Sequence, residues 1–157
     1  MKTLRHAKGF TLIELVVLMI ISGILAAYIL PRLGTRSTFD ERVFKDEIIS
    51  VARYAQQLAM MRGRNATIRF HLDNTTKNYG IDGRQGAGAY NWLAHPNSEI
   101  FPLAVPSGIS VAPSNIIISY DALGNVVNGV SQAITITGAG SNTICIDASG
   151  YAHEGAC

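Results

Sequence analysis

The stretch Lys8-Gly9-Phe10-Thr11-Leu12-Ile13-Glu14-Leu15 opens an apolar run that decides how the whole chain is organised. Residues 10–30 include a single charged side chain, Glu14. As a helix rising about 1.5 Å per residue, this run is roughly 31 Å long, enough to cross a bilayer core of about 30 Å. Basic residues just before the run predict that this end stays in the cytoplasm: Lys2, Arg5 and Lys8.

Two common kinds of N-terminal segment fit this run poorly. A cleaved signal peptide needs a shorter apolar core, and Pro31-Arg32-Leu33 is a poor cleavage site. A plain signal anchor leaves Glu14 unexplained, because an acid near mid-bilayer costs about 2–3 kcal/mol. If the chain were cut between Gly9 and Phe10, the new α-amine of one helix could pair with Glu14 of a parallel neighbour. That pairing would neutralise two charges that lipid disfavours.

The segment from Gly9 to Leu15 resembles the prepilin signature of type IV pilins and type II secretion pseudopilins. The resemblance implies that a prepilin peptidase cuts after Gly9, that Phe10 becomes N-methylated, and that Glu14 is needed for assembly. Pro31 stands where the family tends to carry a proline, and a kink in the helix is expected there. The resemblance is strong over residues 1–35 and general beyond them.

The fold class expected from the resemblance and the patterns below is α+β and pilin-like. A long N-terminal helix, half transmembrane and half amphipathic, packs on an antiparallel β-domain. The expected divisions are a leader peptide at 1–9, a transmembrane and assembly helix at 10–34, an amphipathic helix at 35–63 and an extracytoplasmic β-domain at 64–157.

Apolar residues recur at three- and four-residue steps between residues 38 and 63, which predicts a helix with one face on the β-domain. Ser37 or Thr38 is expected to cap it, and Gly63 to end it. Asp40 and Glu41 are expected in its first turn, where acids favour the helix dipole. The apolar stripe consists of Phe44, Ile48, Val51, Ala55, Leu58 and Ala59, and the opposite face of Arg42, Lys45, Glu47, Arg53 and Gln57.

Alternating apolar residues predict a hairpin at 65–82, and short segments with turn signals predict an antiparallel sheet or two small sheets. A long connection at 83–108, rich in Gly, Pro and Asn, separates the hairpin from the rest and is typical of functional or partly structured loops. The remaining strand candidates are 109–112, 116–120, 126–127, 133–137, 143–147 and 151–153.

The two cysteines of the chain, Cys145 and Cys157, both lie beyond the predicted span, in the compartment where disulfides persist. A bridge would enclose 11 residues and stabilise the fold by about 3 kcal/mol in chain-entropy models. Pilins commonly close a C-terminal loop in this way. Two unpaired thiols are the alternative.

Two further stretches resemble one subgroup of this superfamily, the minor pseudopilin H and minor pilin T type. They are the strand and turn from Ile116 to Asn125 and the segment from Ile144 to Gly150. Together with the cysteine pair, they look closest to the minor pilins of mannose-sensitive haemagglutinin pili.

Charge and composition argue against nucleic acid as a partner. Without the three leader residues, ten of the 13 basic residues remain against 11 acidic ones, and residues 85–157 contain no Lys or Arg. Binding to a phosphate backbone needs clustered cations. The exposed candidates are confined to Arg62, Arg64, Arg69, Lys77 and Arg84.

No set of residues in the sequence forms a convincing catalytic or metal-binding motif, so the chain is expected to be a structural protein without cofactor or metal. Asp121 and Asn125 could offer oxygens to calcium, but Asx residues around a glycine more often form a turn. Tyr90, Trp92 and His95 form a possible partner-binding loop, for which the alternative is that the aromatic rings cover the domain's own core.

The expected function is a minor pilin or pseudopilin subunit that enters or primes a type IV pilus or a type II secretion pseudopilus. Its expected partners are other subunits, the prepilin peptidase, the inner-membrane assembly platform and the lipid bilayer. The protein is expected as a single-pass inner-membrane protein with a periplasmic domain, and later in the filament. The alternative is a pilus-associated adhesin or DNA-uptake receptor, for which the aromatic loop is the motivation.

Overall fold

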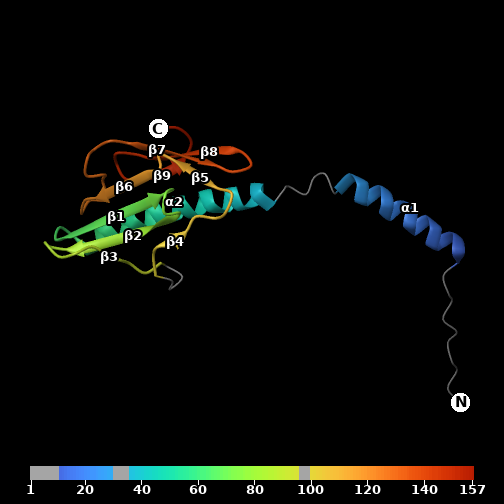
Figure 1. The fold of residues 1–157 in the computed structure, drawn as a ribbon, viewed down its shortest axis with the longest axis horizontal. Coiled ribbons are helices and arrows are strands. Elements are labelled where there is room, and N and C mark those ends of the chain that lie inside the picture. Colours follow the sequence, from blue (N-terminus) through green and yellow to red (C-terminus); the bar gives the residue numbers. More distant parts are fainter. Residues whose placement is uncertain (1–10, 30–35, 96–99) are drawn as a thin grey trace, which may run out of the picture. The chain divides into compact units, whose positions relative to one another are not determined.

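Figure 1 shows the computed structural model of the chain, which describes residues 11–29, 36–95 and 100–157. The chain divides after residue 34 into two compact units, described separately below. The first contains one described helix, α1 (Leu12–Ile29). Thr11 begins this helix as its cap, because its Oγ1 accepts the backbone N–H of Glu14 at 3.3 Å. The expected helix at 10–30 extends beyond the described residues at both ends.

The second unit is built on α2 (Arg36–Arg62), a helix whose predicted apolar stripe is confirmed. All six stripe residues are buried, and Phe44 and Ile48 are among the largest fully buried side chains. The helix ends at Gly63 as expected, with φ 71° and an N–H bonded to Ala59 O at 3.3 Å. The predicted start is wrong, because residues 37 and 38 lie inside the helix. Several hydroxyl residues lie near this start, and local sequence does not choose among them.

One acidic and one basic side chain of α2 differ from the expected pattern. Asp40 and Glu41 were expected in the first turn, which is wrong because α2 begins at Arg36 and its first turn contains no acidic residue. Lys45, which was expected on the exposed face, is buried, and so is Glu41. The Glu41 carboxylate accepts Gly140 N–H at 2.8 Å and also the side-chain amide of Asn142. Lys45 pairs with Glu154 at 2.7 Å. The partners come from the β7–β8 turn and from two strands of the same sheet, about a hundred residues away, which local periodicity does not reveal.

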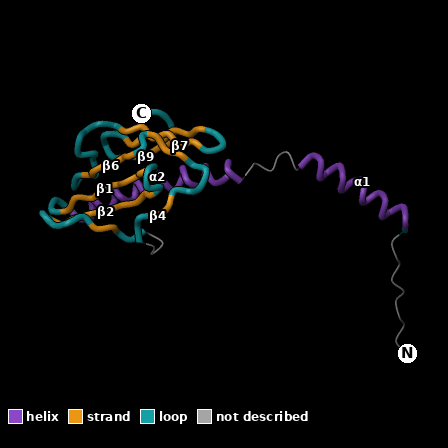
Figure 2. The backbone as a smooth tube through the Cα atoms, in the orientation of Figure 1, coloured by secondary structure: helices purple, strands orange, loops and turns teal. Residues whose placement is uncertain are grey.

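Two antiparallel sheets follow, whose strands are the orange segments of the tube in Figure 2. The first has the order β3-β2-β1-β6, with β4 also pairing with β2. Its strands are β1 (Ala66–Asp73), β2 (Asn78–Gln85), β3 (Asn91–Trp92), β4 (Leu103–Ala104) and β6 (Asn115–Tyr120). The second has the order β5-β7-β8-β9, with strands β5 (Ser110–Ala112), β7 (Gln132–Thr137), β8 (Ser141–Ile146) and β9 (Ala152–Glu154). The expectation of two small antiparallel sheets is confirmed.

The predicted hairpin is confirmed, with Ile68 opposite Gly83 and Phe70 opposite Ile81 in the β1–β2 ladder. Buried and half-buried residues alternate along β1, so one face of the sheet packs on α2 while the other faces outward. The long connection is partly structured, since it contains β3 and β4. The strand expected at 126–127 is wrong: it makes a single bridge, Tyr120 to Val126.

A single hydrophobic core lies between α2 and both sheets of the second unit. Its largest fully buried side chains come from all three layers and include Phe44, Phe70, Tyr120, Ile134 and Ile144. Phe44 also packs edge-on against Tyr79 at 5.3 Å between ring centroids. Because each layer supplies bulky apolar groups to the same core, the positions of the strand ends and loops are fixed relative to one another.

Candidate functional site

The helix α1 presents apolar side chains on every face. All side chains from residue 11 to residue 28 are exposed, and Leu12 is 82 % exposed. A helix that is apolar all round is normally buried in a protein core or in a membrane. Each large aliphatic side chain gains about 1.5–3 kcal/mol when it leaves water. This surface therefore requires a partner, either lipid or other helices.

Glu14 lies in the first turn of α1, with its side chain exposed. Within the described ranges its carboxylate makes no hydrogen bond or ion pair, although its backbone N–H is bonded to Thr11. An acid in the first turn also stabilises its own helix through the macrodipole, typically by 0.3–1 kcal/mol. The carboxylate is thus free to accept a second partner while it favours the helix that carries it.

Three of the predicted positions, Gly9, Phe10 and Pro31, lie outside the described residues. Within the part of the chain that is described, no helix is both long enough and apolar enough to cross a membrane.

The predicted partner-binding loop lies against its own domain. The Tyr90 ring stacks on two guanidinium groups, those of Arg69 at 3.2 Å and Arg84 at 4.5 Å. The Trp92 ring meets His71 edge-on at 5.6 Å, while 41 % of its surface stays exposed. His95 packs against Phe101 at 5.3 Å. These contacts agree with the alternative that the aromatic rings cover the domain itself.

Under this loop lies an ionic cluster on the outer face of the first sheet. Arg69 forms two hydrogen bonds with Asp82, at 2.9 and 2.5 Å. The His71 ring lies 3.2 Å from the same carboxylate. The bond to Asp82 raises the pKa of Arg69, whereas burial lowers the pKa of His71 despite the opposing effect of Asp82. Arg69 is therefore not a free cation for nucleic acid.

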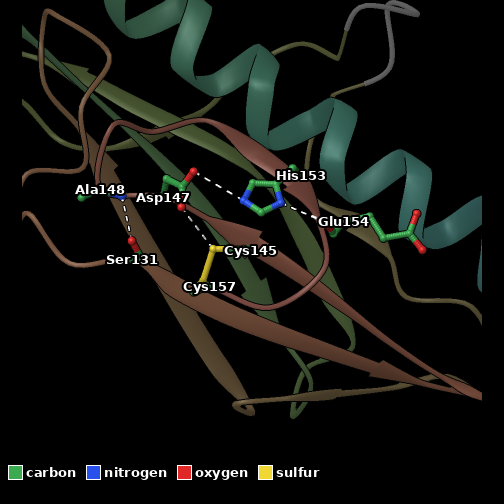
Figure 3. The surroundings of a disulfide bond; sticks show 7 residues. All are labelled: Ser131, Cys145, Asp147, Ala148, His153, Glu154 and Cys157. Atoms are coloured by element: carbon green, nitrogen blue, oxygen red, sulfur yellow. Dashed lines mark hydrogen bonds and ion pairs between the residues drawn. A yellow bond between two sulfur atoms is a disulfide. The ribbon is translucent and has the colours of Figure 1, made fainter.

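The predicted disulfide is present between Cys145 and Cys157, whose Cα atoms lie 5.0 Å apart. Figure 3 shows the bond with its neighbours, among them Asp147, His153 and Glu154. Glu154 accepts a hydrogen bond from the Lys45 ammonium, which raises the pKa of that lysine. The bridge and this ion pair together fasten the C-terminus to β8 and α2.

Two sets of residues resemble cation sites and do not fit a metal. Cys145, Asp147 and His153 bring their ligand atoms within 4.8 Å of one another, but the Cys145 sulfur is consumed by the disulfide. Asp121 Oδ1 accepts the N–H groups of Leu123 and Asn125, at 2.9 and 2.8 Å. That carboxylate holds the turn after β6, as the turn interpretation of this segment expects.

Comparison with known proteins finds a family model that matches the N-terminal segment and a solved structure with a similar fold over most of the chain. A family model described as "Prokaryotic N-terminal methylation motif" matches residues 4–30. A search of curated proteins finds no match. The type IV minor pilin FimU of Pseudomonas aeruginosa strain PAO1, in space group P21, aligns with a TM-score of 0.55 and 16 % identity, over 73 % of this chain and 87 % of that chain. The structure of the same protein in space group P65 aligns with a TM-score of 0.49 and 16 % identity, over 73 % of this chain and 92 % of that chain.

The match at residues 4–30 shows that the chain carries a prepilin-type methylation motif. The likeness to the P21 structure shows that the fold is the pilin-like α+β fold, with a helix packed on antiparallel sheets.

Proposed function

We propose that the chain is a minor pilin or pseudopilin precursor, cut between Gly9 and Phe10 and methylated on the new N-terminal Phe10. Residues 10–30 then hold it in the inner membrane with its β-domain in the periplasm, until the assembly platform adds it to a filament. The observation that carries the proposal is the methylation motif leading into a helix whose large apolar side chains are exposed among the described residues.

The driving force of assembly is the transfer of α1 side chains against the helices of neighbouring subunits. Glu14 sets the register, because its unpaired carboxylate meets the methylated amine of an adjacent subunit in a medium that penalises each charge alone. Pro31 bends the helix where it leaves the membrane.

Within the superfamily, we place the chain with the minor subunits of the pseudopilin H and minor pilin T type, and closest to those of mannose-sensitive haemagglutinin pili. The support is the strand β6 that ends in Tyr120-Asp121 and runs into the turn at Gly124, together with the C-terminal disulfide. The adhesin or uptake-receptor alternative has less support, because Tyr90, Trp92 and His95 all contact their own domain.

Intact-mass analysis of the membrane-extracted protein tests the processing step. The expected mass lacks residues 1–9 and carries one additional methyl group. A Glu14→Gln variant, which keeps the size but not the charge, is expected to be cut normally and to fall at least about tenfold in sheared filaments. Ser22→Ala is the matched control, because Ser22 bonds only to carbonyls of its own helix. Retention of the leader, or normal incorporation of Glu14→Gln, contradicts the proposal.

A further inference from the structure

A cleft of about 560 Å³ opens where β1 begins and β6 ends. Arg64, Thr67 and Arg84 line one wall, at the β1–β2 end of the first sheet. Ser119 and Leu123 line the other wall, from β6 and the turn that follows it. All residues that line the cleft belong to the second unit, the disulfide cysteines are not among them, and the proposed function makes no use of it.

The two arginines of the cleft differ from several cations of the domain that have polar partners. Arg69 and Lys45 are paired with carboxylates, and Arg53 donates to Ala152 O and Tyr151 Oη. Among the described residues neither Arg64 nor Arg84 has such a carboxylate. The Nε of Arg84 is buried without a hydrogen-bond acceptor in this part of the chain. Because no ion pair with a carboxylate of the described residues neutralises these two guanidinium groups, the cleft favours an anionic ligand.

The aromatic loop holds the Arg84 side chain in place. Its guanidinium lies 4.5 Å from the centroid of the Tyr90 ring, in cation–π contact. A guanidinium fixed in this way loses less conformational freedom when it binds, and its planar fork suits an oxyanion that accepts two hydrogen bonds. Thr67 and Ser119 add two hydroxyl groups to the lining.

The opposite wall decides which anion fits. It carries two exposed apolar side chains, Leu123 (77 % exposed) and Val127 (63 %), beside the polar Ser119 and the acidic Asp121. Residues 85–157 contain no Lys or Arg, so this wall offers no cation. A polyanion such as nucleic acid needs a run of cations, which this wall does not supply. A single carboxylate beside an apolar side chain matches both walls.

We propose that this cleft binds an acidic peptide segment of a partner protein, in which one carboxylate stands next to an apolar residue. The carboxylate bonds to Arg84 and Arg64, and the apolar neighbour covers Leu123. This proposal is independent of whether α1 enters a filament.

The test uses the full chain in detergent micelles, labelled with ¹⁵N so that the arginine Nε–H signals are resolved by NMR. The probes are a capped Gly-Leu-Asp-Leu-Gly peptide and its Asn analogue. We expect the signals of Arg84 and Arg64 to shift with the Asp peptide, and the Asn peptide to bind at least about tenfold more weakly. Equal binding of the two peptides, or no shift with either, overturns the proposal.

Arg84→Gln and Arg64→Gln are each expected to weaken binding of the Asp peptide at least about fivefold. Arg62→Gln, outside the cleft, should leave the affinity for this peptide unchanged. Arg64 is exposed, so its variant tests the cleft even if Arg84→Gln fails to fold. A single-stranded oligonucleotide that binds these arginines more tightly than the peptide would assign the cleft to nucleic acid and also overturn the proposal.

Discussion

At the scale of single residues, each buried charged side chain of the described residues has a partner on another element. Asp82 is 6 % exposed and holds Arg69 and His71, and Glu41 is 2 % exposed and holds the β7–β8 turn. Each would be destabilising alone, since an unpaired charge in the interior costs several kcal/mol. Hydrophobic periodicity assigns such residues to the surface, because it does not detect their partners.

Burial of His71 predicts a specific pH dependence of stability. Burial lowers the pKa of His71 in the folded chain, so the unfolded chain binds the proton more readily. The free energy of unfolding should therefore fall as the pH drops through about 6.5, the ordinary histidine value, towards the lower folded-state pKa. Urea denaturation at pH 7, 6 and 5 measures this slope.

His71→Gln removes the titrating group and is expected to flatten that slope. Thr67→Ala, on the same face of β1 and without a titratable group, should keep the wild-type slope. An unchanged slope in His71→Gln would show that other groups cause the acid sensitivity.

At the scale of elements, the sequence predicts α2 and the β1–β2 hairpin well because their apolar residues follow one period without interruption. The prediction of a strand at 126–127, made from two adjacent valines, is wrong. The Asp121 carboxylate binds the backbone of the turn between β6 and these valines, so the chain leaves β6 before a full ladder can form. The contact of Tyr90 with Arg69 and Arg84 joins a loop to a sheet, and no local pattern encodes it.

The C-terminal element depends on its covalent bond. β9 pairs with β8 through only three residue pairs, and the disulfide cysteine Cys157 lies three residues beyond it. Cys157→Ser is expected to lower the free energy of unfolding by about 3 kcal/mol, because the closed loop no longer limits the unfolded chain. Urea denaturation of the oxidised protein measures the loss.

Dithiothreitol should break the disulfide of the wild type and lower its free energy of unfolding to that of the variant. The free energy of unfolding of Cys157→Ser should not change with dithiothreitol. Equal stability of the oxidised wild type and the variant would show that the ion pair of Lys45 with Glu154 suffices to hold β9.

At the scale of the whole molecule, every residue of the described core comes from the second unit, between Phe44 and Ala152. The motif and apolar run of residues 8–30 predict the assembly segment, and the patterns after residue 38 predict the folded domain. The sequence indicates two units because the apolar residues of the first segment are exposed, whereas those of the second are buried in a core. The contacts that join loops and charged residues on the surface of the domain can be read only from the fold.

The last prediction concerns this independence of the two units. A fragment of residues 36–157 retains the whole described core, so it should be soluble and monomeric without detergent and unfold within about 2 °C of the full chain. The full chain should need detergent, because α1 exposes its apolar side chains.

A shorter fragment, 44–157, lacks Glu41, whose carboxylate bonds to Gly140 and Asn142. Hydrogen bonds to a charged group contribute about 1.5–3 kcal/mol each, so this fragment should melt at least about 5 °C lower. Thermal melts followed by circular dichroism compare the three proteins. If the 36–157 fragment aggregates or melts far below the full chain, the domain depends on the preceding segment and the two units are not independent.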